Sequence, residues 1–136
     1  MRRDAVVRND LSAEATEWLS DYFDAIDARD VDAFGCFLAE ECALQLNYVG
    51  PLPGKAAVLG MLGPYWASLA GVAHEPRLII GDDHQFAVEG LHHYQTRTGR
   101  THAIPATEWI DRDSAGQAAR IRIYCDATPV FAEETA

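Results

Sequence analysis

Basic residues are scarce in this chain. Its 136 residues contain 11 lysines and arginines against 21 aspartates and glutamates, which gives a formal net charge of −10 at pH 7. The basic residues are scattered along the sequence, whereas binding to nucleic acid or to an anionic membrane requires a basic surface. The charge balance therefore predicts that neither nucleic acid nor membrane is a partner.

Long apolar runs and paired cysteines are also missing. No stretch approaches the roughly 18 apolar residues of a membrane helix, and the two arginines near the start are not followed by the apolar stretch of a signal peptide. The three cysteines, Cys36, Cys42 and Cys125, form no C-x-x-C pair. They predict neither a disulfide framework nor a zinc knuckle, and free thiols fit a cytoplasmic protein best.

Sequence motifs for cofactors are absent as well. The glycines form neither a GxGxxG nor a Walker pattern, and the five histidines show neither His-x-His nor HExxH spacing. We therefore expect no nucleotide cofactor and no metal ion in the functional site.

What the chain does contain is enough apolar sequence for one core. Hydrophobic residues make up 49% of a length that is typical of a single domain. We expect one domain over residues 11–131. A flexible N-terminus over residues 1–10 would precede it, and a C-terminal tail over residues 132–136 would follow.

The first half of the chain has helical periodicity. Ser12 can cap a helix whose apolar residues recur at three- and four-residue spacing. Those apolar positions are Trp18, Leu19, Tyr22, Phe23 and Ile26. A second, short helix is expected after Asp30. A third is expected within residues 53–71, where Pro64 should kink or restart it.

The second half has the pattern of strands joined by hairpins. Residues 42–50 form a first alternating segment, and four more follow after Pro76: residues 77–81, 85–97, 101–111 and 119–126. Short polar or glycine-containing turns separate the last four, which predicts an antiparallel sheet. Helices followed by such a meander indicate the α+β class.

This order of elements resembles the nuclear transport factor 2-like superfamily and, within it, the SnoaL-like proteins. That superfamily includes polyketide cyclases, ketosteroid isomerase, limonene epoxide hydrolase and scytalone dehydratase. "YFDAIDARDVDAF" resembles the family's passage from its first to its second helix, and "FLAEECALQLN" resembles its entry into the first strand. "ARIRIYCD" resembles the last strand, where the cyclases and epoxide hydrolases carry an acidic residue. The resemblance implies a cone-shaped, curved antiparallel sheet wrapped on three N-terminal helices, with an internal pocket.

The resemblance also implies catalytic residues. Asp126 matches the catalytic acid/base of the cyclases, and Tyr124, two residues earlier, should face the same cavity. Tyr22 matches the tyrosine that donates to the developing oxyanion in the isomerase. Asn47 falls at or next to the place of the isomerase's base. An asparagine cannot abstract a proton, and the Arg-x-Asp pair of the epoxide hydrolases does not occur in residues 88–94. The chain therefore lacks the complete set of catalytic residues of either the isomerase or the epoxide hydrolases.

Alternatives remain open for the two leading residues. A carboxyl in an apolar pocket has a raised pKa, which would suit Asp126 to proton transfer. Asp126 could instead cap the turn before Pro129 or pair with Arg122, which we expect at the solvated rim of the pocket. Tyr22 belongs to a stripe of core residues, and its hydroxyl needs a partner whether or not a substrate supplies it.

Histidines and a second carboxyl complete the candidates. His92 and His93 are adjacent on a strand, so only one of them can face the cavity. His102 and Glu108 share a strand face, and matching to the family favours that face, rather than that of Trp109, as the inner one. Trp18 and Trp66 are candidates for substrate contacts, with core packing as the alternative for both. His74 and His84 are expected at the surface.

The sequence thus predicts an enzyme without a cofactor. It would act on a small hydrophobic or polyketide-like metabolite by cyclase, isomerase or dehydratase chemistry, with Asp126, Tyr22, Asn47 and one of the adjacent histidines as catalytic groups. The alternative is a non-catalytic binding or assembly module of the same fold. We also expect a homodimer formed through the outer face of the sheet, as is common in the superfamily.

Overall fold

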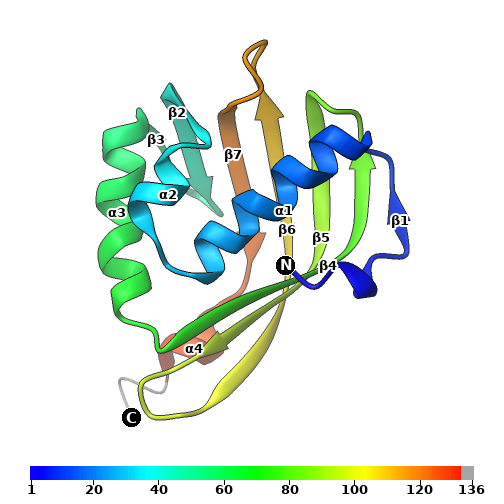
Figure 1. Ribbon diagram of the computed structural model, residues 1–136. Coiled ribbons are helices and arrows are strands. Elements are labelled where there is room, and N and C mark those ends of the chain that lie inside the picture. Colours follow the sequence, from blue (N-terminus) through cyan, green and yellow to red (C-terminus); the bar gives the residue numbers. More distant parts are fainter. Residues whose placement is uncertain (133–136) are drawn as a thin grey trace.

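A curved, unclosed sheet of seven strands forms the body of the protein in the computed structural model, which describes residues 1–132 (Figure 1). The strands occur in the spatial order β1-β4-β5-β6-β7-β2-β3. Their bounds are β1 (Arg8–Asn9), β2 (Leu38–Leu46), β3 (Val49–Pro53), β4 (Gly71–Gly81), β5 (Gln85–Gln95), β6 (Thr101–Arg112) and β7 (Ala118–Cys125).

Helices cover one face of this sheet (Figure 1). They are α1 (Ala13–Asp27), α2 (Val31–Gly35) and α3 (Lys55–Ala67), with a short α4 (Thr128–Ala132) and a single turn η1 (Arg3–Ala5) near the ends of the described chain. The Ser12 side chain accepts a hydrogen bond from the backbone of Ala15 at the start of α1, and Asp30 caps α2 in the same way. The buried stripe of α1 packs on the sheet, and the α+β class is confirmed.

The sheet is mixed, not antiparallel throughout as expected. β2 runs parallel to β7, and β1 runs parallel to β4, whereas the other neighbouring pairs are antiparallel. Hairpin signals in a sequence report only pairs of strands that follow each other directly. They carry no information about β7 returning to lie beside β2. In this pairing Leu46 is in register with Ile123, which is 77 residues later in the chain.

The segment expected as one strand over residues 42–50 is a hairpin. β2 begins at Leu38, turns at Asn47 and Tyr48, and pairs with β3. Asn47 has a φ of 53°, in the left-handed region that asparagine tolerates better than most residues. β3 contains Pro51 and Pro53, which an edge strand can accommodate because one side of it needs no backbone donors.

The structure also describes two stretches for which the sequence suggested an irregular or flexible backbone. α3 runs without interruption through Pro64, which lies on its exposed side and in its last turn, where one lost backbone hydrogen bond matters least. Residues 1–10, expected to be flexible, contain η1 and β1 and bind the edge of β4: the Val7 N–H donates to the Arg77 carbonyl at 2.8 Å. Of the expected tail, residues 133–136 lie outside the described residues.

A β-bulge in β4 shifts which of its residues face the helices. The pairing with β5 slips between Pro76 and Leu78, so the buried residues change from His74 and Pro76 to Ile79. Pro76 fits there because a bulge tolerates a residue without a backbone N–H. Opposite the bulge lies Gly90, where an added Cβ would stand 2.1 Å from the Glu75 carbonyl oxygen.

No helix within residues 1–132 has the length and apolar composition needed to span a membrane.

The close packing of Gly90 against the bulge leads to a prediction about stability. Gly90→Ala should lower the free energy of unfolding by about 1–3 kcal/mol or more, because the new methyl group overlaps backbone atoms that cannot easily move. Gly60→Ala is the matched control: it lies in α3 with nothing within 4 Å of the added Cβ, so it should stabilise the helix by about 0.5–1 kcal/mol. Urea unfolding of both variants measures the difference, and equal effects would contradict the prediction.

Candidate functional site

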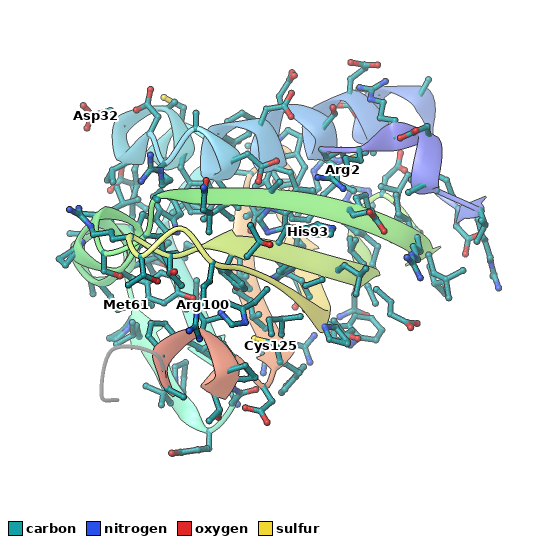
Figure 2. All side chains as sticks on the ribbon, turned by 90° about the horizontal axis from the view of Figure 1, so that it is seen from below. Arg2, Asp32, Met61, His93, Arg100 and Cys125 are labelled. Carbon is teal, nitrogen blue, oxygen red and sulfur yellow. The ribbon has the colours of Figure 1, made fainter. Side chains whose placement is uncertain are left out.

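A pocket of about 680 Å³ lies between the helices and the concave face of the sheet. Most of its lining is apolar, from the sheet residues Leu44, Leu46, Val72 and Ile123 and the helix residues Ile26, Phe34, Met61, Leu62 and Trp66. Its exposed lining residues, which mark the mouth, come from the β2–β3 turn, from the connection between β7 and α4, and from α4 itself. Figure 2 shows α4 next to Cys125, across the end of β7.

The buried end of the pocket is polar. Five side chains meet there: Tyr22 from α1, His74 from β4, His92 and Tyr94 from β5, and Glu108 from β6. Every one of them is buried. An apolar cavity with a few convergent polar groups is the usual form of a small-molecule site.

A hydrogen bond between Tyr22 and Glu108 is the first pair in this cluster. The Tyr22 hydroxyl donates to Glu108 Oε1 at 2.7 Å, and the glutamate is only 2% exposed. Burial raises the pKa of the Glu108 carboxyl, and His74 and Tyr22 counteract only part of that effect. Burial also raises the pKa of the Tyr22 hydroxyl well above its usual value, so it stays a donor.

A carboxylate–histidine pair is the second. Asp27, the last residue of α1, places Oδ1 2.5 Å from His74 Nδ1, and its other oxygen accepts the His74 backbone N–H at 3.3 Å. With Nδ1 donating to the carboxylate, the neutral ring carries its lone pair on Nε2. The imidazole also stacks on Phe23 with the ring centroids 4.5 Å apart, so its orientation is fixed from two sides.

His92 lies directly opposite His74 in the register of β4 and β5. Their ring centroids are 4.3 Å apart, and His92 Nδ1 is 3.3 Å from the Tyr94 hydroxyl. Burial lowers the pKa of His92 well below its usual value, and the neighbouring His74 and His93 lower it further. His92 is therefore neutral at physiological pH.

The same cluster contains the groups that could hold a metal ion. His74, His92 and Glu108 each place one potential ligand atom within 4.8 Å of the other two, and they form the one such group among residues 1–132. Neither histidine spacing along the chain nor a short motif would reveal it, because the three residues lie on three neighbouring strands.

Asp126 is at the mouth of the pocket and is exposed. Its Oδ1 accepts the Thr128 backbone N–H at 3.0 Å at the start of α4. Hydrogen bonds from the Thr128 side chain and backbone lower the pKa of this carboxyl. The expected rise in pKa was wrong, and the alternative of a turn cap describes its contacts. Arg122 lies 3.6 Å from Asp111, not at Asp126.

Tyr124, His93 and Trp18 lie away from the pocket. Tyr124, expected inside, is exposed on the outer face, because Ile123 and Cys125 take the inward positions of β7. His93 also points outward and contacts Glu75 at 3.2 Å. Trp18 stacks on Tyr22 outside the pocket lining and carries the Arg112 guanidinium 4.5 Å above its ring.

Asn47 lines the pocket, but its side-chain amide is hydrogen-bonded to the backbone of Cys125. Nδ2 donates to the Cys125 carbonyl at 2.8 Å, and Oδ1 accepts the Cys125 N–H at 3.0 Å. These two bonds join the β2–β3 turn to the end of β7. Trp66 is buried in the pocket wall with its ring against Phe34. His102 is half-buried and does not line the pocket.

Glu108 and His92 face inward, which decides two orientations that the sequence left open. Sequence reasoning missed Asp27 and His74, and it wrongly placed His74 at the surface. The signal was present: β4 begins at Gly71, and Val72 and His74 alternate inward before Pro76. Treating Pro76 as the start of strand structure concealed this pattern.

Comparison with protein families identifies the class of protein. Residues 19–121 match the family model of the SnoaL-like domain. This is more than half of the chain, which therefore belongs to the SnoaL-like domain family. The comparison with curated proteins found no match.

Solved structures share the fold. An NTF2-like protein of unknown function from Burkholderia pseudomallei has a TM-score of 0.78 and 15% identity, covering 92% of this chain and 100% of that one. A candidate polyketide cyclase from Xanthomonas campestris pv. campestris has a TM-score of 0.70 and 26% identity, covering 87% and 94%. An LEH-like epoxide hydrolase of M. tuberculosis has a TM-score of 0.72 and 15% identity, covering 89% of each chain. These likenesses confirm the NTF2-like fold and the resemblance drawn from the sequence.

Tyr22→Phe tests the buried pair. The change leaves Glu108 without its donor, which should cost about 1–3 kcal/mol of unfolding free energy. The double variant Tyr22→Phe/Glu108→Met should recover part of that loss, since it leaves no unpaired buried group. Tyr48→Phe is the control, because Tyr48 is 93% exposed. Urea unfolding measures all three variants, and a Tyr22→Phe protein as stable as the control contradicts the assigned hydrogen bond.

Proposed function

We propose that the protein is a cofactor-independent enzyme that moves protons on a small hydrophobic metabolite bearing a carbonyl group. The observation that carries this proposal is the convergence of an Asp27–His74 pair and a Tyr22–Glu108 pair at the buried end of one apolar pocket. A substrate whose apolar body fills the pocket would place its polar end among these groups.

His74 is the proton acceptor in this proposal. Asp27 holds Nδ1, so Nε2 is the atom that can take a proton from a carbon next to the substrate carbonyl. As the C–H bond breaks, its electron pair forms the enolate double bond, and negative charge collects on the carbonyl oxygen. Asp27 then stabilises the imidazolium through the Nδ1 hydrogen bond.

Glu108 faces the oxygen on which charge develops. Tyr22 occupies Glu108 Oε1 and orients the carboxyl, which leaves Oε2 to donate to the substrate oxygen when the group is protonated. The proton held by His74 then decides the product. Its return to another carbon gives isomerisation, its transfer to the alkoxide formed when the enolate attacks a second carbonyl gives cyclisation, and its transfer to a β-hydroxyl that leaves as water gives dehydration. Asp126 takes no proton-transfer role in the proposal, because it is exposed and caps α4.

Relatives agree with this class of chemistry without defining the reaction. The similar structures include a candidate polyketide cyclase and an epoxide hydrolase, and we propose a polyketide-like carbonyl compound as the substrate class. One observation favours the alternative of a binding module: Tyr22 and His74, two of the polar groups at the buried end, already have a protein partner. A carrier and an enzyme differ in whether bound carbonyl compounds lose protons faster.

Proton exchange on a model ketone tests the enzyme. With 2-tetralone in D₂O, ¹H NMR follows replacement of the protons next to the carbonyl, and the protein should accelerate it. His74→Ala should lower the rate about 10²–10⁴-fold, the usual contribution of a general base. Asp27→Asn should lower kcat more than it raises KM, because it misdirects the imidazole without removing it.

His84→Ala is the matched control. It removes an exposed histidine in the β4–β5 turn and should leave the exchange rate unchanged. Binding of the ketone without any acceleration would favour the carrier. Equal acceleration by the wild type and His74→Ala would contradict the assignment of the base.

We further propose that two copies of the chain pair through the outer face of the sheet. Trp109 and Tyr124 point outward on the neighbouring strands β6 and β7, where the Arg122 guanidinium lies over the Trp109 ring. Light scattering should give the dimer mass for the wild type, and Trp109→Ala/Tyr124→Ser should shift it toward the monomer. A monomeric wild type at high concentration contradicts this contact.

A further inference from the structure

Three metal-ligating side chains converge at the buried end of the pocket from three neighbouring strands. His74 belongs to β4, His92 to β5 and Glu108 to β6, and one potential ligand atom of each lies within 4.8 Å of the others. β4, β5 and β6 are side by side, and α1 crosses their face (Figure 1). The register that pairs His74 with His92 is therefore what assembles the cluster.

We propose that His74, His92 and Glu108 form a binding site for a divalent transition-metal ion. This inference goes beyond the proposed function, because an ion at this position would occupy the atoms that proton transfer requires. Two imidazoles and one carboxylate are a ligand set that suits zinc and iron(II), and they leave coordination positions open. Calcium and magnesium prefer sites made of oxygen atoms alone.

The geometry of the two rings is close to what one ion requires. Their centroids are 4.3 Å apart and their planes are inclined by 61°. Two imidazoles that share one zinc ion at a Zn–N distance of about 2.1 Å have centroids about 5 Å apart. Side-chain adjustments on the order of 1 Å would bring the ligand atoms to bonding distance.

Each ligand is already held at the atom that would face away from the ion. Asp27 binds His74 Nδ1, and Tyr22 binds Glu108 Oε1. Tyr94 lies 3.3 Å from His92 Nδ1. These contacts leave His74 Nε2, His92 Nε2 and Glu108 Oε2 as ligand atoms. Hydrogen bonding of a ligating histidine to a carboxylate is the usual outer support of a metal ligand, since it fixes the tautomer and the ring orientation.

Space and charge agree with an ion. A second, small cavity of about 10 Å³ is lined by all three ligands together with Gly90 and Phe23, and this is about the volume that one water-sized species needs. On its other side the cluster opens into the large pocket, from which a substrate or water could complete the coordination. A divalent ion would also compensate the negative charge that the Glu108 carboxyl carries when it binds the ion in this buried place.

Calorimetry on untagged, EDTA-stripped protein tests the site, because a histidine tag would bind the same ions. Titration with ZnCl₂ should show one ion per chain. His74→Ala and His92→Ala should abolish this binding, and Glu108→Gln should weaken it at least tenfold. Asp27→Asn, which removes only the outer support, should weaken it about 10–100-fold. His84→Ala and His93→Ala are the matched controls and should bind as the wild type does.

Two further measurements keep the outcome decisive if a variant fails to fold. Native mass spectrometry of the wild type should show the 1:1 zinc adduct, and His92→Gln, which can still contact Tyr94, should lose it. Absence of a 1:1 adduct in the wild type, or equal affinity in His92→Gln, overturns the metal site.

The metal site and the proposed proton transfer can fail separately. If both hold, zinc should inhibit ketone exchange with the same stoichiometry at which it binds. Zinc binding without exchange activity would remove the proposed function and keep the metal site. Exchange activity without zinc binding would remove the metal site and keep the proposed function.

Discussion

The position of α1 over the sheet depends on a carboxyl group that has almost no contact with water. Glu108 lies on the central strand β6, at the bottom of an apolar pocket, where an unpaired polar group would be costly. The Tyr22 hydroxyl is its hydrogen-bond donor, and Tyr22 can reach it only if α1 crosses the sheet at this point. One turn further, Asp27 makes the second polar connection, to His74. These two polar connections hold the helix at this place, and its apolar stripe supplies most of the burial.

The same two bonds prepare the chemistry of the pocket. A histidine whose Nδ1 is committed to a carboxylate presents a defined lone pair at Nε2, and a glutamate with one oxygen committed to a tyrosine presents the other. His92 is kept neutral by burial beside them. This arrangement of side chains is the basis of both proposals, proton transfer to a substrate and binding of a cation.

Irregular features of the sheet build the site around this cluster. The bulge in β4 lets Pro76 remain in a strand and turns His74 inward. Gly90 lies opposite the bulge, and its lack of a side chain leaves room for the backbone carbonyl of Glu75. At the mouth, Asn47 binds both backbone groups of Cys125 and thereby anchors the β2–β3 turn beside β7. The polar side chains first expected to act on a substrate here, Asn47 and Asp126, are occupied with backbone atoms.

The sequence by itself determined the class of the fold, because local periodicity and capping residues such as Ser12 act over a few residues. It also determined that Tyr22 belongs to the buried stripe of α1, and its likeness to SnoaL-like proteins pointed to Glu108 on the inner face. Only the tertiary structure decided the parallel pairing of β2 with β7, the inward turn of His74 and the meeting of Asp27 with it. Those contacts join residues that are distant in the chain, and a one-residue bulge reverses the face that alternation predicts. Asp126 shows the same limit: its place on the chain matched a catalytic acid, but the backbone N–H of Thr128, positioned by the fold, gave it a different partner.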